Sequence, residues 1–213
     1  MYPLGVLKKK VTTLLALSFN TDYTDSSAFA HVFTGIGTPL VLGGALVLNG
    51  SSAITTPDSA SYDTPITEGD FTIEARVRLT TLNTFSFILN KVISGSQPYA
   101  FFYDSSNFLR FLAYRAAGGG IFVNVSSAVA LIAITDSNFH HVAVSRKGSV
   151  FKLFLDGNLV DSVTNATMGH LINNTANLMV GSETQDASGS NNFKGEIDWL
   201  KISSKAIYEA NFT

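Results

Sequence analysis

The sequence predicts an all-β domain built as two stacked antiparallel sheets with very little helix. Its 213 residues include 16 Phe and 7 Tyr but only 14% charged residues. Aromatic and β-branched side chains favour a pleated, half-buried sheet surface. Short apolar runs are separated by clusters of Gly, Asn, Asp, Ser and Pro, which is the spacing expected of a β-sandwich. We therefore expect one domain at residues 13–213, preceded by an N-terminal arm at residues 1–12.

The clearest strand is expected at residues 71–79. Its odd-numbered residues are apolar and share one face, whereas its even-numbered residues, Thr72 to Arg78, are polar and share the other. An opening strand is expected where Leu15, Leu17 and Phe19 alternate. Further strands are expected at residues 85–91, 99–103, 108–114, 121–125, 139–146, 150–155, 159–163 and 193–203.

Turn residues connect these strands. Glycines at 118–120, the segment 147–149 and the pair Asp156-Gly157 each allow a tight chain reversal, so residues 139–163 should form a three-stranded meander. In the last strand, alternation predicts that Phe193, Ile197 and Trp199 face inward. Single helical turns are expected only near residues 58–62 and 205–209.

Charge and cysteine content exclude several classes of protein. The 14 Lys and Arg are balanced by 16 Asp and Glu without a long block of either sign, so nucleic acid is not an expected partner. The chain has no Cys, which excludes disulfides, thiol nucleophiles and thiolate metal sites. We expect no membrane-spanning segment, because no run of about 18 apolar residues occurs. The basic residues 8–10 and the apolar stretch after them lack the cleavage pattern of a signal peptide.

The N-terminal arm is the expected attachment element. A flexible arm that orders against a partner can anchor a domain, at the cost of its own conformational entropy. The residues predicted to contact the partner are Tyr2, Leu4, Val6, Leu7, Lys8, Lys9 and Lys10.

Three segments carry a family resemblance: FTIEARVRL (71–79), FHHVAVSRKGSVFKLFLDGNLVDS (139–162) and FKGEIDWLKIS (193–203). Over residues 13–213 the chain resembles the laminin G-like branch of the concanavalin A-like lectin and glucanase superfamily, which implies an antiparallel jelly-roll β-sandwich. Arg76 and Phe139 stand where this family often has Trp, and Trp199 stands where an acidic residue is common. The segments LLALSFNTDYTDSS and SSKAIYEANFT are similar to laminin G-like modules of tailed-phage virion proteins, which implies location in a virus particle.

Catalysis is not expected. Glucanases of this superfamily carry E-x-D-x-x-E on a strand, and Glu196 and Asp198 match its first two carboxylates. Lys201 replaces the third, whereas retaining hydrolysis needs an acid/base about 5 Å from the nucleophile. Glu196 and Asp198 are therefore expected to solvate the outer face of the last strand.

No resident cofactor is expected, although calcium is an open alternative. The resemblance implies Asp186, Asn191 and Asn192, or Asp22 and Asp25, as candidate oxygen ligands, but we favour ordinary turn hydrogen bonds for them. The neighbours His140 and His141 should point to opposite faces of a strand, so they cannot chelate one ion together. His31 and His170 are isolated in the sequence.

Two functions remain open. The leading hypothesis is a non-enzymatic structural virion protein of a tailed phage, attached to the capsid or tail, with other virion proteins as partners and a homo-oligomer as an option. The alternative is a glycan-binding adhesion module that recognises host surface polysaccharide. For that role the candidate ligand-binding aromatics are Tyr99, Tyr103 and Tyr114, although aromatics on a large sheet more often belong to the core.

Overall fold

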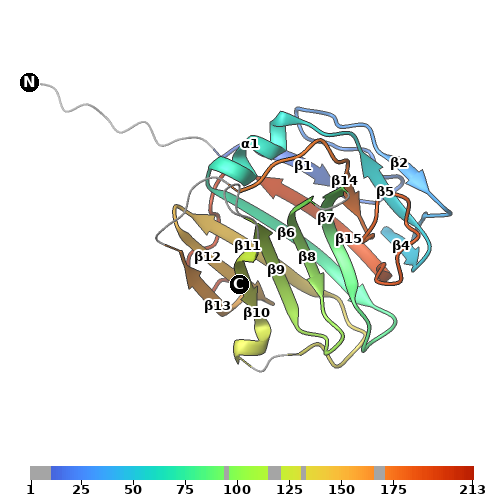
Figure 1. The fold of residues 1–213 in the computed structure, drawn as a ribbon. Coiled ribbons are helices and arrows are strands. Elements are labelled where there is room, and N and C mark those ends of the chain that lie inside the picture. The colour runs from blue at the N-terminus through green and yellow to red at the C-terminus, as the bar shows by residue number, and fades with distance from the viewer. Residues whose placement is uncertain (1–10, 94–95, 115–120, 131–132, 166–170) are drawn as a thin grey trace, which may run out of the picture.

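Two antiparallel sheets stack face to face in the computed structural model, which describes residues 11–93, 96–114, 121–130, 133–165 and 171–213 (Figure 1). The order in the eight-stranded sheet is β13 (Asn158–Thr164), β12 (Val150–Leu155), β11 (His140–Lys147), β6 (Phe71–Leu79), β15 (Lys194–Ser203), β4 (Ala45–Asn49) and β3 (Leu40–Leu42), and β1 (Thr13–Leu17) pairs with the end of β15.

The seven-stranded sheet lies in front of it in Figure 1. Its order is β10 (Ile121–Ser126), β9 (Leu109–Tyr114), β8 (Ser96–Tyr103), β7 (Ser86–Ile93), β14 (Leu178–Val180), β5 (Ala53–Thr56) and β2 (Thr34–Ile36). The prediction of an all-β sandwich with two stacked antiparallel sheets is confirmed.

Strand β6 behaves as its alternating sequence predicts. Phe71, Ile73 and Ala75 are completely buried between the sheets, and Val77 and Leu79 are nearly so. The strand pairs with β11 on one side and β15 on the other, so its apolar face lies in the middle of the eight-stranded sheet. Burial of such a face supplies the main favourable free energy of folding.

The predicted orientation of Trp199 is wrong, because a β-bulge interrupts β15. Ile197 lies opposite Val77, but the next paired residue, Trp199, lies opposite Arg76. The extra residue, Asp198, shifts the alternation by one position and turns Trp199 outward. There its ring centroid lies 5.2 Å from that of His141.

The predicted turns of the meander are confirmed. Asp156 and Gly157 have φ values of 48° and 76°, as a two-residue hairpin turn requires, and they join β12 to β13. Gly148, with φ 56°, lies in the turn between β11 and β12. The predicted glycine turn at 118–120 lies outside the described residues.

Helix among the described residues is confined to short segments. The helix α1 (Ala60–Glu68) crosses one end of the sandwich and begins where a helical turn was predicted (Figure 1). A 3₁₀ turn, η1, covers Ser127–Ala130. Residues 205–209 are not helical, contrary to the prediction, because this segment is held along the outer face of the eight-stranded sheet. The rings of Tyr208 and Phe212 stack with centroids 3.7 Å apart, and the Phe212 N–H donates to the Gly157 carbonyl. Among the described residues no helix has the length and apolar character needed to cross a membrane.

Candidate functional site

The outer face of the seven-stranded sheet carries the candidate site. Along β8, Tyr99, Phe101 and Tyr103 point into the core with no exposed surface, whereas Ala100 and Phe102 point outward. This burial corrects the expectation that Tyr99 and Tyr103 contact a glycan, because no ligand on the surface reaches them. The third candidate, Tyr114, is half-buried on β9.

A ladder of phenylalanines crosses this outer face. The rings of Phe87 and Phe102 stack with centroids 4.8 Å apart, and Phe85 stacks on Phe102 at 6.1 Å. Phe87 and Phe102 are almost covered, while Phe85 is 37% exposed. A partly exposed ring with a rigid support can stack on an apolar ligand face at a low entropic cost.

The segment 183–192 forms a wall beside this face, alongside β7. The Asn90 side chain donates to the Glu183 carbonyl at 2.7 Å, and the Phe87 N–H donates to the Asn191 carbonyl at 3.3 Å. Asn192 is completely buried, accepts from the Ser182 hydroxyl and the Glu183 N–H, and donates to the carbonyls of Gly50 and Ala187. These bonds fix the wall against the sheet.

The calcium candidates in this wall are engaged in local hydrogen bonds. Asp186 accepts from both the N–H and the hydroxyl of Ser188, and Asn191 donates to Glu183 Oε2 at 2.9 Å. In the same way Asp25 accepts from the backbone N–H groups of Ala16, Ser27 and His31. Within the described part of the chain, no group of three or more His, Asp or Glu residues is arranged to hold a metal ion.

A cavity of about 750 Å³, the β7–β8 cavity, lies between the end of the β7–β8 hairpin and the wall. Its lining combines the apolar side chains Val92 and Ile93 with polar ones, and Ile93 is 45% exposed. The polar lining residues are Gln97, Glu183, Thr184, Gln185 and Asp186. A concave site of this size with a few fixed polar groups suits a small ligand.

Hydrogen bonds hold the polar groups of the cavity in place. The Gln97 amide donates to Asn90 Oδ1 at 2.9 Å, and the Gln185 amide exchanges two bonds with the backbone of Asn177. The hydroxyl and N–H of Ser188 lower the pKa of Asp186 to about 2, so this carboxylate is an anion at neutral pH. Since a carboxylate can accept about four hydrogen bonds, Asp186 and Glu183 keep capacity for a ligand.

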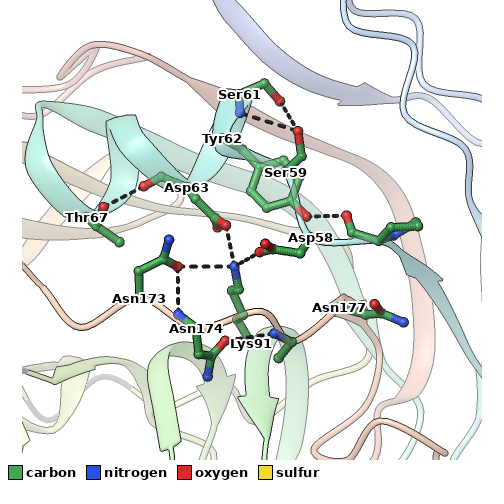
Figure 2. A network of polar contacts seen from close by, with 12 residues as sticks. Asp58, Ser59, Ser61, Tyr62, Asp63, Thr67, Lys91, Asn173, Asn174 and Asn177 are labelled. Atoms are coloured by element: carbon green, nitrogen blue, oxygen red, sulfur yellow. Dashed lines mark hydrogen bonds and ion pairs between the residues drawn. The ribbon is translucent and has the colours of Figure 1, made fainter.

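A buried ion network lies beneath α1, at the end of the sandwich (Figure 2). The Lys91 side chain is completely buried, and its ammonium group pairs with Asp58 and Asp63 and donates to Asn173 Oδ1 at 3.2 Å. Burial and the neighbouring Asp58 raise the pKa of Asp63 to about 7, against the opposite effect of Lys91. This network ties α1 and residue 173 to β7, with Lys91 and Asp63 buried and Asp58 partly exposed.

His140, His141 and the Glu196–Asp198 pair lie on the other sheet. His140 bonds to Asp156 at 2.7 Å and to Asp136 at 3.0 Å, whereas His141 bonds to Glu74, so the two rings serve different partners. Burial opposes the charged form of His140, but the hydrogen bonds to the two aspartates outweigh it and raise the pKa of the ring.

Each candidate catalytic carboxylate has an arginine partner. Glu196 pairs with Arg78, and Asp198 pairs with Arg76 at 2.6 Å. Both guanidinium groups also lie over the ring of Phe139, at 4.6 and 4.9 Å from its centroid. The N-terminal residues 1–10, including the seven predicted partner contacts, and His170 lie outside the described residues.

Sequence reasoning missed the β7–β8 cavity and the Lys91 network. Both combine segments about 80 to 90 positions apart, as the bonds Asn90–Glu183 and Lys91–Asn173 illustrate. The one signal in the sequence was Lys91 itself, a charged residue within an apolar strand, which is rarely buried without a partner.

The architecture defines a lectin-like β-sandwich. The chain belongs to the concanavalin A-like lectin/glucanases superfamily, whose family model matches residues 48–211. No curated protein has a significant match to the sequence.

Solved structures confirm the fold. Domain 4 of AbnA, a GH43 extracellular arabinanase from Geobacillus stearothermophilus solved in complex with arabinotriose, has a TM-score of 0.69 and 19% identity, covering 94% of this chain and 96% of that domain. The binding domain of botulinum neurotoxin DC in complex with SialylT has a TM-score of 0.66 and 13% identity, with 92% of this chain and 49% of that chain covered. NanB, solved with Optactamide, has a TM-score of 0.62 and 16% identity, with 80% and 27% covered. The chain thus spans nearly all of the arabinanase domain but about half or less of the other two chains.

Proposed function

We propose that this domain binds a neutral polysaccharide without cleaving it. The observation that carries the proposal is the β7–β8 cavity, where apolar Val92 and Ile93 lie beside the polar groups of Gln97 and Asp186. A sugar ring has the same two features, C–H faces and hydroxyl edges, so the cavity offers a contact of each kind. The arabinotriose bound to the similar arabinanase domain agrees with this class of ligand.

The extent of the surface favours a chain of sugars over a single one. Phe87 and Ile93 are six residues apart on β7, which corresponds to about 20 Å along an extended strand. The exposed ring of Phe85 provides a stacking surface at the Phe87 end, while the polar cavity lies at the Ile93 end. A polysaccharide can contact both.

The charge of the cavity favours a neutral ligand. Glu183 and Asp186 line it, and no Lys or Arg is among the lining residues that the structure describes. A uronic or sialic acid would bring its carboxylate towards these anions, and like charges in a partly desolvated site disfavour binding.

The ion pairs on the other sheet support the absence of catalysis. Glu196 and Asp198, the remnants of the glucanase pattern, are each paired with an arginine, and Lys201 replaces the third carboxylate. Retaining hydrolysis requires one carboxyl to carry a proton while a second attacks. Two arginine-paired carboxylates do not provide that combination.

Binding by designed variants tests this proposal. A glycan array should identify neutral ligands, and calorimetry should then show about 2- to 12-fold weakening in Gln97→Ala and in Phe85→Ala, because each removes one contact worth about 0.5–1.5 kcal/mol. Glu196→Gln, on the opposite sheet, is the matched control and should bind normally. Equal binding by all variants, or turnover of the polysaccharide, would refute the proposal.

We also propose that the domain belongs to a tailed-phage particle and is attached through residues 1–10. This rests on the resemblance of residues 14–27 and 203–213 to phage laminin G-like modules. The two segments begin side by side, because β1 pairs with the end of β15, with Thr13 opposite Ser203 and Leu15 opposite Ile202. The Ser204 N–H also donates to the Thr12 carbonyl at 2.9 Å, where the arm joins the domain. Binding to the host surface would then be the task of the particle-bound domain.

Particle composition tests the attachment. Deletion of residues 1–10 should leave a folded domain that is missing from purified particles, because β1 begins at Thr13. Triple substitution of Lys8, Lys9 and Lys10 by Ala tests the contribution of the basic part of the arm to attachment independently of its apolar part. Retention of the deleted protein in particles would contradict the proposal.

A further inference from the structure

Strand β3 forms an uncharged, apolar edge of the eight-stranded sheet. It pairs with β4 and with no other strand among the residues that the structure describes. Leu40 and Leu42 are 58% and 69% exposed, while Val41 packs against the core. Natural edge strands are protected by a short length, by Pro or by charged side chains; β3 is short and follows Pro39, but residues 26–57 contain no Asp, Glu, Lys or Arg.

The hairpin geometry leaves the backbone of Val41 facing the open edge. Gly43 and Gly44, with φ values of 63° and 83°, form a two-residue turn between Leu42 and Ala45. In such a hairpin the residues that flank the turn form a hydrogen-bonded pair, and the pattern alternates along the strand. The N–H and C=O of Leu42 and Leu40 therefore point to β4, and those of Val41 point away from it.

We propose that two copies of this chain pair through β3 in an antiparallel, two-fold symmetric manner, with the axis at Val41. The two Val41 residues then exchange both backbone hydrogen bonds. Leu40 of one copy lies opposite Leu42 of the other, and the four leucines form one apolar cluster on the outer face of the joined sheets. Val32, 73% exposed and two residues before β2, lies on the same side of the sandwich, because only residues 37–39 connect β2 to β3.

A second copy fits this edge better than an unrelated partner does. A two-fold interface brings a surface against itself, so any charge on it would meet a like charge. The uncharged segment 26–57 avoids this repulsion, and it offers no charge with which to select an acidic or basic partner. Pro39 and the turn at Gly43 limit the pairing to a few residues, and the two-fold axis closes the assembly at a dimer.

The arrangement has a consequence for the proposed carbohydrate binding. The axis of an antiparallel edge pair is perpendicular to the sheet, so the two eight-stranded sheets become one continuous layer. Both seven-stranded sheets then lie on the same side of this layer, and both β7–β8 cavities open in the same direction. A polysaccharide-coated surface would engage them together, and avidity could exceed single-site affinity by about 100-fold or more. The dimer itself does not depend on the identity of the ligand.

Light scattering and sedimentation of the full chain over a range of concentrations test the pairing. The mass should rise to that of two copies, and the variant that carries Leu40→Lys and Leu42→Lys should raise the dissociation constant by about 100-fold or more, because like charges then face one another. Leu159→Lys, on the opposite edge strand β13 where Leu159 is 37% exposed, is the matched control and should still dimerise. A monomer at every concentration, or a dimer that persists in the Leu40/Leu42 variant, would overturn the proposal.

Cross-linking provides a second, independent readout. The chain has no Cys, so cysteines introduced at positions 40 and 42 are its only thiols. In the proposed dimer Leu40 of one copy and Leu42 of the other form a non-hydrogen-bonded pair with a Cα separation of about 4.5 Å, which a disulfide can span. The variant that carries Leu40→Cys and Leu42→Cys should therefore form a covalent dimer under mild oxidation much faster than Leu159→Cys. Equal rates for the two variants would count against an axis at Val41.

Discussion

Replacement of Lys91 by Met should strongly destabilise the domain. Met keeps much of the length of the lysine side chain but removes the ammonium group that pairs with Asp58 and Asp63. Lys91 is completely buried and the Asp63 side chain is 2% exposed, so the carboxylate of Asp63 would remain in the interior without its cation. Removal of one partner from a buried ion pair typically costs about 3–5 kcal/mol.

The two carboxylates do not contribute equally to this cost. The Asp58 side chain is 34% exposed, so water can replace part of what Lys91 provides, and most of the penalty falls on Asp63. Lys91 acts to lower the pKa of Asp63, which is already raised to about 7 by burial. Without Lys91 the carboxyl binds a proton more readily, and that proton removes the buried charge. The loss of stability should thus be larger at pH 8 than at pH 5.

Urea unfolding followed by circular dichroism measures this change. Lys205→Met, at an exposed lysine, is the matched control and should alter the unfolding free energy by less than about 0.5 kcal/mol. Addition of Asp63→Asn to Lys91→Met should recover part of the loss, because the unpaired charge is then gone. A loss below about 1 kcal/mol at pH 8 would refute the reasoning, since it would mean that water or rearrangement satisfies Asp63 as well as Lys91 does.

Three further predictions concern stability. The pKa of Asp63 is raised from its ordinary 3.8 to about 7, so between pH 3.8 and pH 7 the folded state binds a proton that the unfolded state does not. The stability that this proton provides is lost as pH rises through about 7. Urea titrations at several pH values should show a smaller decline in Asp63→Asn. Tyr103→Phe removes a buried hydroxyl that has no hydrogen-bond partner among the described residues. The melting temperature should therefore stay equal or rise, and carbohydrate binding should be unchanged. A clear loss of stability would reveal a partner. Gly195→Ala should lower the unfolding free energy by about 2 kcal/mol or more, since φ is 155° and the new Cβ would lie 2.0 Å from the Arg78 carbonyl oxygen. Gly148→Ala should lower it by about 1 kcal/mol, because the new Cβ meets nothing within 4 Å. Equal melting temperatures for the two glycine variants would contradict the steric argument.

Periodicity predicted those strands in which one face is polar. In β6 the polar residues Thr72 to Arg78 alternate with apolar ones, so a single assignment of faces was possible, and it is confirmed. In β8 both sets are apolar or aromatic, because Tyr99 and Tyr103 alternate with Ala100 and Phe102. The pattern alone therefore could not predict which set faces the core.

The bulge and the candidate site depended on tertiary contacts. Nothing in the residues around Asp198 distinguishes a bulged residue from a regular one, so simple alternation placed Trp199 on the wrong face. The β7–β8 cavity joins Gln97 to Asp186, which are distant in the sequence and come together only when β14 inserts beside β7. Sequence reasoning named Asp186 only as a calcium candidate and had no means to find its neighbours in the cavity.

Affinity electrophoresis of the native protein gives the most direct test of carbohydrate binding at the seven-stranded sheet. In gels that contain neutral polysaccharides, including arabinan, we expect at least one to retard the protein, and Phe85→Ala combined with Gln97→Ala should abolish the retardation. Gels that contain polyuronic or sialic acid polymers should leave the mobility unchanged. Retardation by acidic polymers alone, or by none of the polysaccharides, would contradict the proposal that the β7–β8 cavity is a site for neutral sugars.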